Sequence, residues 1–105
     1  IEGASIAKKG DKLYMFYAGA YNNAPQQIGV AVSEDGLNWK RLSEEPFLRN
    51  GKPGEWNSSE SGHPHLFTDL DGRTYMFYHG NNDHGKTWYI TQQEVLWKDG
   101  KPYLK

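Results

Sequence analysis

Two side chains that could carry out acid–base chemistry stand at matching distances from one repeated aromatic motif. Glu2 lies twelve residues before Tyr14, and His63 lies twelve residues before Tyr75. These tyrosines open two copies of Tyr-Met-Phe-Tyr, 61 positions apart. Carboxyl and imidazole groups are common proton donors and acceptors in enzymes. We therefore expect Glu2 and His63 to occupy equivalent positions in two repeated units and to meet at one polar site.

A second histidine follows the first closely enough to suggest metal binding. His63 and His65 are two positions apart, which would place them on one face of a strand. Paired imidazoles are frequent metal ligands, although Pro64 lies between these two and no third ligand is evident. Two interpretations stay open. Either the two histidines bind a metal ion, or His63 lines a cavity while His65 packs or forms hydrogen bonds.

Trp56 is the candidate for contact with a ligand ring. It lies in the polar loop "GKPGEWNSSESG", where an exposed indole could stack on a sugar. Packing of Trp56 against a neighbouring unit is an equal alternative. The aspartates are different, because they lie in short Gly-containing turns where their side chains are expected to bind backbone amides. These are Asp11, Asp35, Asp69, Asp71 and Asp99.

The elements that must position these residues are strands. Seven tyrosines, four tryptophans, four phenylalanines and twelve glycines are typical of a β protein with tight turns. No helical periodicity continues beyond about two turns. The sequence predicts an all-β fold with strands at 5–8, 12–18, 27–33, 39–41, 65–68, 74–79, 86–91, 94–97 and 102–104.

The amino-acid composition limits the classes of partner that the chain could bind. Twelve basic and thirteen acidic residues give no electrostatic attraction for nucleic acid or an anionic membrane surface. No apolar run reaches membrane-spanning length. The absence of cysteine excludes disulfides and thiolate metal sites but leaves the compartment open.

The repeat predicts the architecture. A period of about 60 residues with roughly four strands per unit suits blades of a β-propeller. We expect one partial propeller domain over 1–105, with units at roughly 1–60 and 61–105. The strand before each aromatic motif would be the innermost, so Glu2 and His63 would face a central channel. About three or more stacked units are normally needed to bury both faces. The chain therefore reads as a piece of something longer, with faces and edges that other blades or another copy must cover.

Four segments, in order, resemble a known family. They are "EGASIAKKGDKLYMFYAG", "IGVAVSEDGLNW", "ESGHPHLFTDLDGRTYMFYHG" and "EVLWKDGKPYL". Together they resemble the last two blades of the five-bladed-propeller glycoside hydrolases of family 43. Those enzymes act mainly on arabinose- and xylose-containing polysaccharides. The fructosyl enzymes of families 32 and 68 and the family 130 phosphorylases share parts of this pattern.

The resemblance implies roles for particular residues. The family's Glu-Gly-Pro element falls on Glu2-Gly3-Ala4, which implies that Glu2 is the general acid. Its Gly-His-Gly-Ser element falls on 62–65, which implies that His63 faces the central cavity, beside or near a calcium ion. The sequence departs from the family pattern at Ala4 and at Pro64-His65. Enzymes of this kind in bacteria are commonly exported, which favours an extracellular or periplasmic location.

The resemblance therefore implies a fragment of a glycoside hydrolase that supplies the acid and is inactive alone. Glycosidic cleavage needs two carboxyl groups on opposite sides of the bond. In the family, the second comes from earlier blades. The alternative is a noncatalytic segment that binds carbohydrate, or associates with itself, through its exposed edges.

Overall fold

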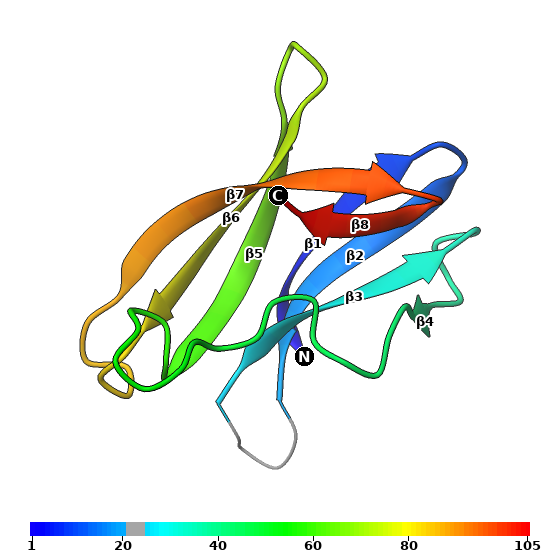
Figure 1. The fold of residues 1–105 in the computed structure, drawn as a ribbon. Helices are drawn as coiled ribbons and strands as arrows, with labels where there is room; N and C mark the ends of the chain where they lie inside the picture. The colour runs from blue at the N-terminus through cyan, green and yellow to red at the C-terminus, as the bar shows by residue number, and fades with distance from the viewer. Residues whose placement is uncertain (21–24) are drawn as a thin grey trace.

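The chain folds into two antiparallel sheets of four strands each (Figure 1). This computed structural model describes residues 1–20 and 25–105, and the described residues form no helix, hence none that could span a membrane. The first sheet contains β1 (Glu2–Lys9), β2 (Lys12–Gly19), β3 (Gln27–Ser33) and β4 (Lys40–Arg41), in that order. The second contains β5 (Glu60–Thr68), β6 (Thr74–Asn81), β7 (Tyr89–Lys98) and β8 (Lys101–Leu104). The prediction of two four-stranded units is confirmed.

The two copies of the aromatic motif bury opposite faces of their strands. In β2, the first and third motif residues, Tyr14 and Phe16, are buried in the core between the sheets. In β6 the second and fourth, Met76 and Tyr78, enter the same core. Because side chains alternate along a strand, the two sheets present opposite faces of one repeated motif to each other. This is the arrangement expected of successive propeller blades.

Polar contacts fix the two sheets to each other. The backbone amide of Leu66 on β5 donates to Ser5 Oγ on β1 at 3.0 Å. Near the other end of the interface, the Tyr14 hydroxyl donates to the carbonyl oxygen of Gly100, in the turn between β7 and β8. The Tyr14 ring also meets the Trp97 ring edge-on, with centroids 4.8 Å apart. β1 and β5, the first strands of the two sheets, therefore have a fixed relative position.

Two of the predicted strands form a single strand in the structure, so their separation was wrong. Separate strands were expected at 86–91 and 94–97, but β7 runs unbroken from Tyr89 to Lys98. The glutamines between them do not interrupt the ladder. Gln92 pairs with Phe77 across the sheet, and Gln93 donates through Nε2 to the Tyr78 hydroxyl at 2.6 Å. The two glutamines are therefore part of one continuous strand.

Candidate active site

One end of the two sheets brings the predicted site residues together. β1 and β5 begin there, β2 and β6 end there, and β3 and β7 begin there, because neighbouring strands are antiparallel. Glu2 pairs with Ala18, Gly62 pairs with His79, and Tyr89 pairs with Gly80. In Figure 1 this end lies at the bottom of the molecule. The strand termini and the loops that follow them thus converge on one region.

Glu2 is exposed, and it is held by a neighbour from the next hairpin. The Gln26 side chain donates through Nε2 to Glu2 Oε1 at 2.6 Å. The backbone carbonyl of Gln26 in turn accepts a hydrogen bond from the Ser61 amide at 3.0 Å. A single residue therefore connects the Glu2 carboxylate on β1 with the beginning of β5.

Both inner strands carry a bulge close to their beginning. In β1 the pairing shifts between Glu2 and Ser5, so that two residues oppose one on β2. In β5 it shifts between Gly62 and His65 in the same way. The first bulged residue has left-handed backbone in each case, at Gly3 with φ 61° and at His63 with φ 52°. Such bulges re-aim side chains near functional sites.

The predicted equivalence of Glu2 and His63 is wrong by one residue, as the strand pairing around the two bulges shows. His63 occupies the position of Gly3, and Gly62 occupies that of Glu2. The hairpin loop explains the shift. The pair Lys8–Leu13 encloses residues 9–12, whereas the pair Thr68–Thr74 encloses 69–73, one residue more. Counting back from the aromatic motif crosses this longer loop and misplaces the inner strand.

Glu2 and His63 nevertheless lie at adjoining positions of the two sheets. A Cβ placed on Gly3, the neighbour of Glu2, would lie 3.2 Å from His63 Cα, Cγ and Nδ1. The backbone at Gly3 is therefore in close contact with the His63 ring. The two residues reach the same end of the molecule without being equivalent.

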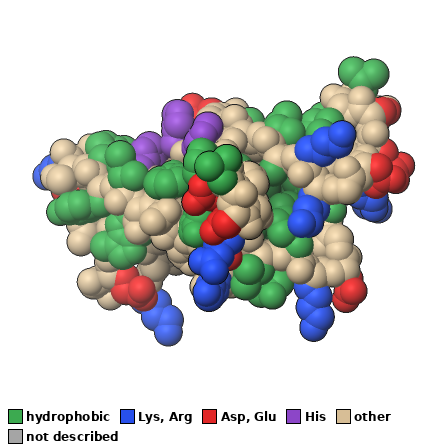
Figure 2. Space-filling view, turned by 90° about the horizontal axis from the view of Figure 1, so that it is seen from above, with side chains coloured by type: hydrophobic (Ala, Val, Ile, Leu, Met, Phe, Trp, Pro, Cys, Tyr) green, Lys and Arg blue, Asp and Glu red, His purple; other side chains and the backbone are tan. Residues whose placement is uncertain are grey.

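His63 begins a row of three aromatic side chains. Its ring centroid lies 5.5 Å from that of His79, and the His79 centroid lies 4.4 Å from that of Trp88. Burial lowers the pKa of His79, and the nearby His63 lowers it further, while Glu60 opposes the shift. The central ring is therefore biased toward the neutral form. Figure 2 shows histidine side chains gathered on one face of the molecule.

The two tryptophans near this end have different surroundings. The Trp56 ring is half-buried and lies 5.8 Å from the Tyr78 ring, and a Cβ on Gly80 would lie 2.9 Å from Trp56 Cζ3. Trp56 thus packs against the core, and its remaining surface lines a shallow hollow with Tyr89. Trp88 is 45% exposed and lies beside His79. Sequence reasoning missed Trp88, whose only signal was an indole in a polar stretch after the second aromatic motif.

The described residues do not form a calcium site around His63. Calcium binds six to eight oxygen ligands. The side chain whose ring lies nearest to His63 in the aromatic row is another imidazole, and no group of three or more acidic, histidine or cysteine side chains gathers within residues 1–20 and 25–105. This segment by itself therefore does not fit the ion that the family resemblance implied.

Three of the turn aspartates bind backbone amides, as predicted. Asp35 accepts from the amides of Leu37 and Asn38, both at 2.9 Å, and these bonds hold its pKa well below the usual range. Asp69 and Asp71 likewise accept from amides of their own turn. These three carboxylates therefore serve the hairpins.

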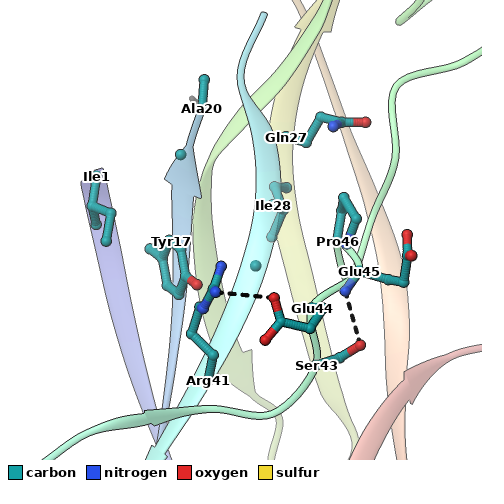
Figure 3. Close-up of a pocket in the computed structure, with 12 residues that line it drawn as sticks. Ile1, Tyr17, Ala20, Gln27, Ile28, Arg41, Ser43, Glu44, Glu45 and Pro46 are labelled. Carbon is teal, nitrogen blue, oxygen red and sulfur yellow. Dashed lines mark hydrogen bonds and ion pairs between the residues drawn. The ribbon is translucent and has the colours of Figure 1, made fainter. Parts of the chain in front are cut away.

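A separate hollow lies on the outer face of the first sheet (Figure 3). Its volume is about 290 Å³, and it is lined by Tyr17, the 43–46 segment and an Arg41–Glu44 ion pair of 3.2 Å. A Cβ on Gly29 would lie 2.8 Å from the Tyr17 hydroxyl, so glycine makes room for this ring. Neither Glu2 nor His63 lines this hollow. It is a different surface from the predicted polar site.

Known proteins that are similar to this chain act on carbohydrates, by their names, and are about three times as long. Beta-1,2-mannobiose phosphorylase of Thermoanaerobacter sp. (strain X514) is 30% identical over 110 aligned positions, which cover 91% of this chain and 34% of that protein. A crystal structure of a thermostable family-43 glycoside hydrolase is 28% identical with a TM-score of 0.82, over 99% of this chain and 35% of the other. An endo-1,4-beta-xylanase from Bacteroides thetaiotaomicron VPI-5482 is 21% identical with a TM-score of 0.80, over 99% and 37%.

The chain spans about a third of the length of these relatives, in agreement with two blades of a larger propeller. The likeness to the xylanase establishes the shared backbone fold. The family model described as "Glycosyl hydrolases family 43" matches residues 1–102, nearly the whole chain. The chain therefore belongs to glycosyl hydrolase family 43.

Proposed function

We propose that this chain is the part of a glycoside hydrolase that supplies the general acid, Glu2, to a site completed by other propeller blades. The substrate would be an arabinose- or xylose-containing polysaccharide or oligosaccharide. The observation that carries the proposal is the position of Glu2. It begins β1, beside a bulge, its carboxylate accepts a hydrogen bond from Gln26, and its chain neighbour Gly3 is in close contact with His63.

The chemistry assigns Glu2 one half of a two-carboxylate reaction. The acid protonates the glycosidic oxygen as the bond to the sugar breaks, and a second carboxylate activates water or attacks the sugar. Asp35, Asp69 and Asp71 are bound to turn amides, so the second group must come from outside these turns. The family resemblance places this second carboxylate in an earlier blade, so the proposal expects no hydrolysis by residues 1–105 alone.

His63 and the aromatic row are the proposed sugar-binding surface. Sugar rings stack on flat aromatic faces, and the exposed Trp88 presents such a face next to His79 and His63. Trp56 remains a further candidate through the part of its ring that lines the hollow beside Tyr89. Solved structures that share this fold include an arabinanase and a xylosidase, which supports the choice of pentose polymers.

The test uses a complete propeller. Residues 1–105 replace the matching third of the thermostable family-43 enzyme, and hydrolysis of xylosides and arabinofuranosides is measured. We expect Glu2→Gln to lower kcat on substrates with poor leaving groups by about 100-fold or more, the contribution of a general acid. Glu34→Gln, at an exposed turn glutamate, is the matched control and should leave kcat unchanged.

The outcomes separate the enzyme from the noncatalytic alternative. A chimera that folds, hydrolyses substrate and is unaffected by Glu2→Gln would contradict the assigned role. A chimera that binds xylo- or arabino-oligosaccharides with no turnover would favour a noncatalytic binding segment. Turnover by residues 1–105 alone would contradict the proposed incompleteness.

A further inference from the structure

Gln26 makes contacts with both inner strands. It lies immediately before β3, and its Nε2 donates to Glu2 Oε1 on β1 at 2.6 Å. Its backbone carbonyl accepts the Ser61 amide of β5 at 3.0 Å. Its Oε1 lies 3.2 Å from the place where a Cβ of Gly62 would be. The Gln26 side-chain amide is therefore hydrogen-bonded to β1 through Nε2, and its Oε1 lies close to Gly62 of β5.

The β5 side of this contact is rigid. Ser61 is fully buried, and its Oγ accepts a hydrogen bond from Asn57 Nδ2 at 2.9 Å, within the buried interior. A Cβ on Gly62 would lie 3.2 Å from both the Ala18 Cβ and Gln26 Oε1, so any side chain there would press on the amide. The glycine thus leaves room for Gln26, and the buried serine fixes its backbone.

We propose that Gln26 is a positioning residue for the Glu2 carboxyl group, an inference that rests on the function proposed above. An amide N–H that donates to Oε1 leaves Oε2 free to carry the proton toward the leaving-group oxygen. The amide has no charge, so it orients the acid without adding a fixed cation beside the transferred proton. Its anchoring to Ser61 would link the acid of one blade to the neighbouring blade.

The leaving group distinguishes an effect on the acid from a general effect on the site. A good leaving group such as dinitrophenolate departs without protonation, whereas a sugar or an unactivated alcohol requires it. In the chimera, Gln26→Met keeps the side-chain length but removes the donor. We expect kcat to fall about tenfold for poor leaving groups, part of the contribution of a general acid. For dinitrophenyl glycosides kcat should change less than about twofold.

Companion variants make the result decisive. Gln26→Leu keeps a similar size but likewise removes the donor, and should reproduce the dependence on leaving group. Gln92→Met, at an exposed glutamine of β7, should change neither rate. Adding Gln26→Met to Glu2→Gln should produce little further loss, because a residue that acts through Glu2 has no effect once the acid is gone. Thermal unfolding of each variant checks that the chimera is folded.

Each failure has its own signature. If Glu2→Gln itself shows no dependence on leaving group, the proposed function fails. If Glu2→Gln shows that dependence while the Gln26 variants slow all substrates equally, or none, the positioning role is overturned and the proposed function stands. A further loss of about tenfold in the Glu2→Gln background would also overturn it.

Discussion

His63 has a left-handed backbone conformation, and the equivalent position in the first sheet is occupied by a glycine, Gly3. Both residues lie at the first position of a bulge, with φ of 52° for His63 and 61° for Gly3. A left-handed conformation costs a non-glycine residue about 1 kcal/mol or more. Glycine adopts it without that penalty. Strain that is present in one sheet and avoided in the other agrees with the proposal that His63 contributes its imidazole to the site.

This difference predicts that His63→Gly separates stability from activity. The free energy of unfolding should change by less than about 1 kcal/mol, because relief of strain offsets the greater chain entropy of glycine. Activity of the chimera should fall, since the imidazole is lost from the proposed sugar-binding surface. Denaturant titration and kinetics on the same preparations measure the two effects. A loss of more than about 2 kcal/mol would assign His63 a structural role instead.

Gly3→Ala is the opposite change and serves as the control. Its Cβ would lie 3.2 Å from the His63 backbone and ring, at a φ that disfavours alanine. It should therefore destabilise the chain by about 1 kcal/mol or more. Part of that loss should be recovered when His63 is also glycine, because the ring that the Cβ meets is then absent.

At the level of elements, Tyr14 joins the first sheet to the last hairpin of the second. Its hydroxyl donates to the Gly100 carbonyl, and its ring meets that of Trp97. Asp99, which precedes Gly100, is also left-handed, with φ 52°, so the turn between β7 and β8 has a tight and specific shape. The hydroxyl fixes this turn against β2.

Tyr14→Phe should lower the free energy of unfolding by about 1 kcal/mol, the usual net value of one hydrogen bond. The ring contacts with Trp97 would remain, so the loss reports the hydroxyl alone. Tyr103→Phe, at a tyrosine that is 45% exposed on β8, is the matched control and should be neutral. Chemical denaturation of both variants provides the comparison. Equal stability of Tyr14→Phe and the parent would show that the turn holds its position without this bond.

The elements also show which structural features could be predicted from the sequence and which could not. The all-β fold followed from the aromatic and β-branched strands and from the Asp-Gly turns, which are local signals. The position of His63 did not follow, because its distance from Tyr75 includes a hairpin loop one residue longer than the first. Trp88 lies in a loop with no periodicity, and its proximity to His79 arises only when the sheet forms. Sites built across strands are therefore the part that spacing alone misplaces.

At the scale of the whole molecule, the aromatic motif indicates that both faces of each sheet are suited to packing against other sheets. The first sheet buries Tyr14 and Phe16 and leaves Met15 on its outer face, whereas the second buries Met76 and Tyr78 and leaves Phe77 outside, 38% exposed. A motif that is apolar at four consecutive positions has no solvent face. Each outer face is therefore of the kind that a further blade would cover under the proposed function.

The outer face of the second sheet makes the sharpest prediction about assembly. Phe67, Phe77 and Ile90 share this face and are 49%, 38% and 79% exposed. Exposed apolar sheet faces associate, so residues 1–105 alone should self-associate with increasing concentration in sedimentation velocity. Phe67→Thr combined with Ile90→Lys should shift the chain toward monomer, because a polar residue and a charge then interrupt the face.

The matched control is Leu70→Lys, a residue fully exposed at a hairpin tip away from that face. It adds the same charge as Ile90→Lys but should leave association unchanged. The same Phe67→Thr and Ile90→Lys changes, placed in the complete chimera, should lower its thermal stability, because another blade would cover this face there. If instead the isolated chain stays monomeric at high concentration and the chimera tolerates both changes, the face is not a blade interface. The apolar residues of the second motif copy would then need a different explanation.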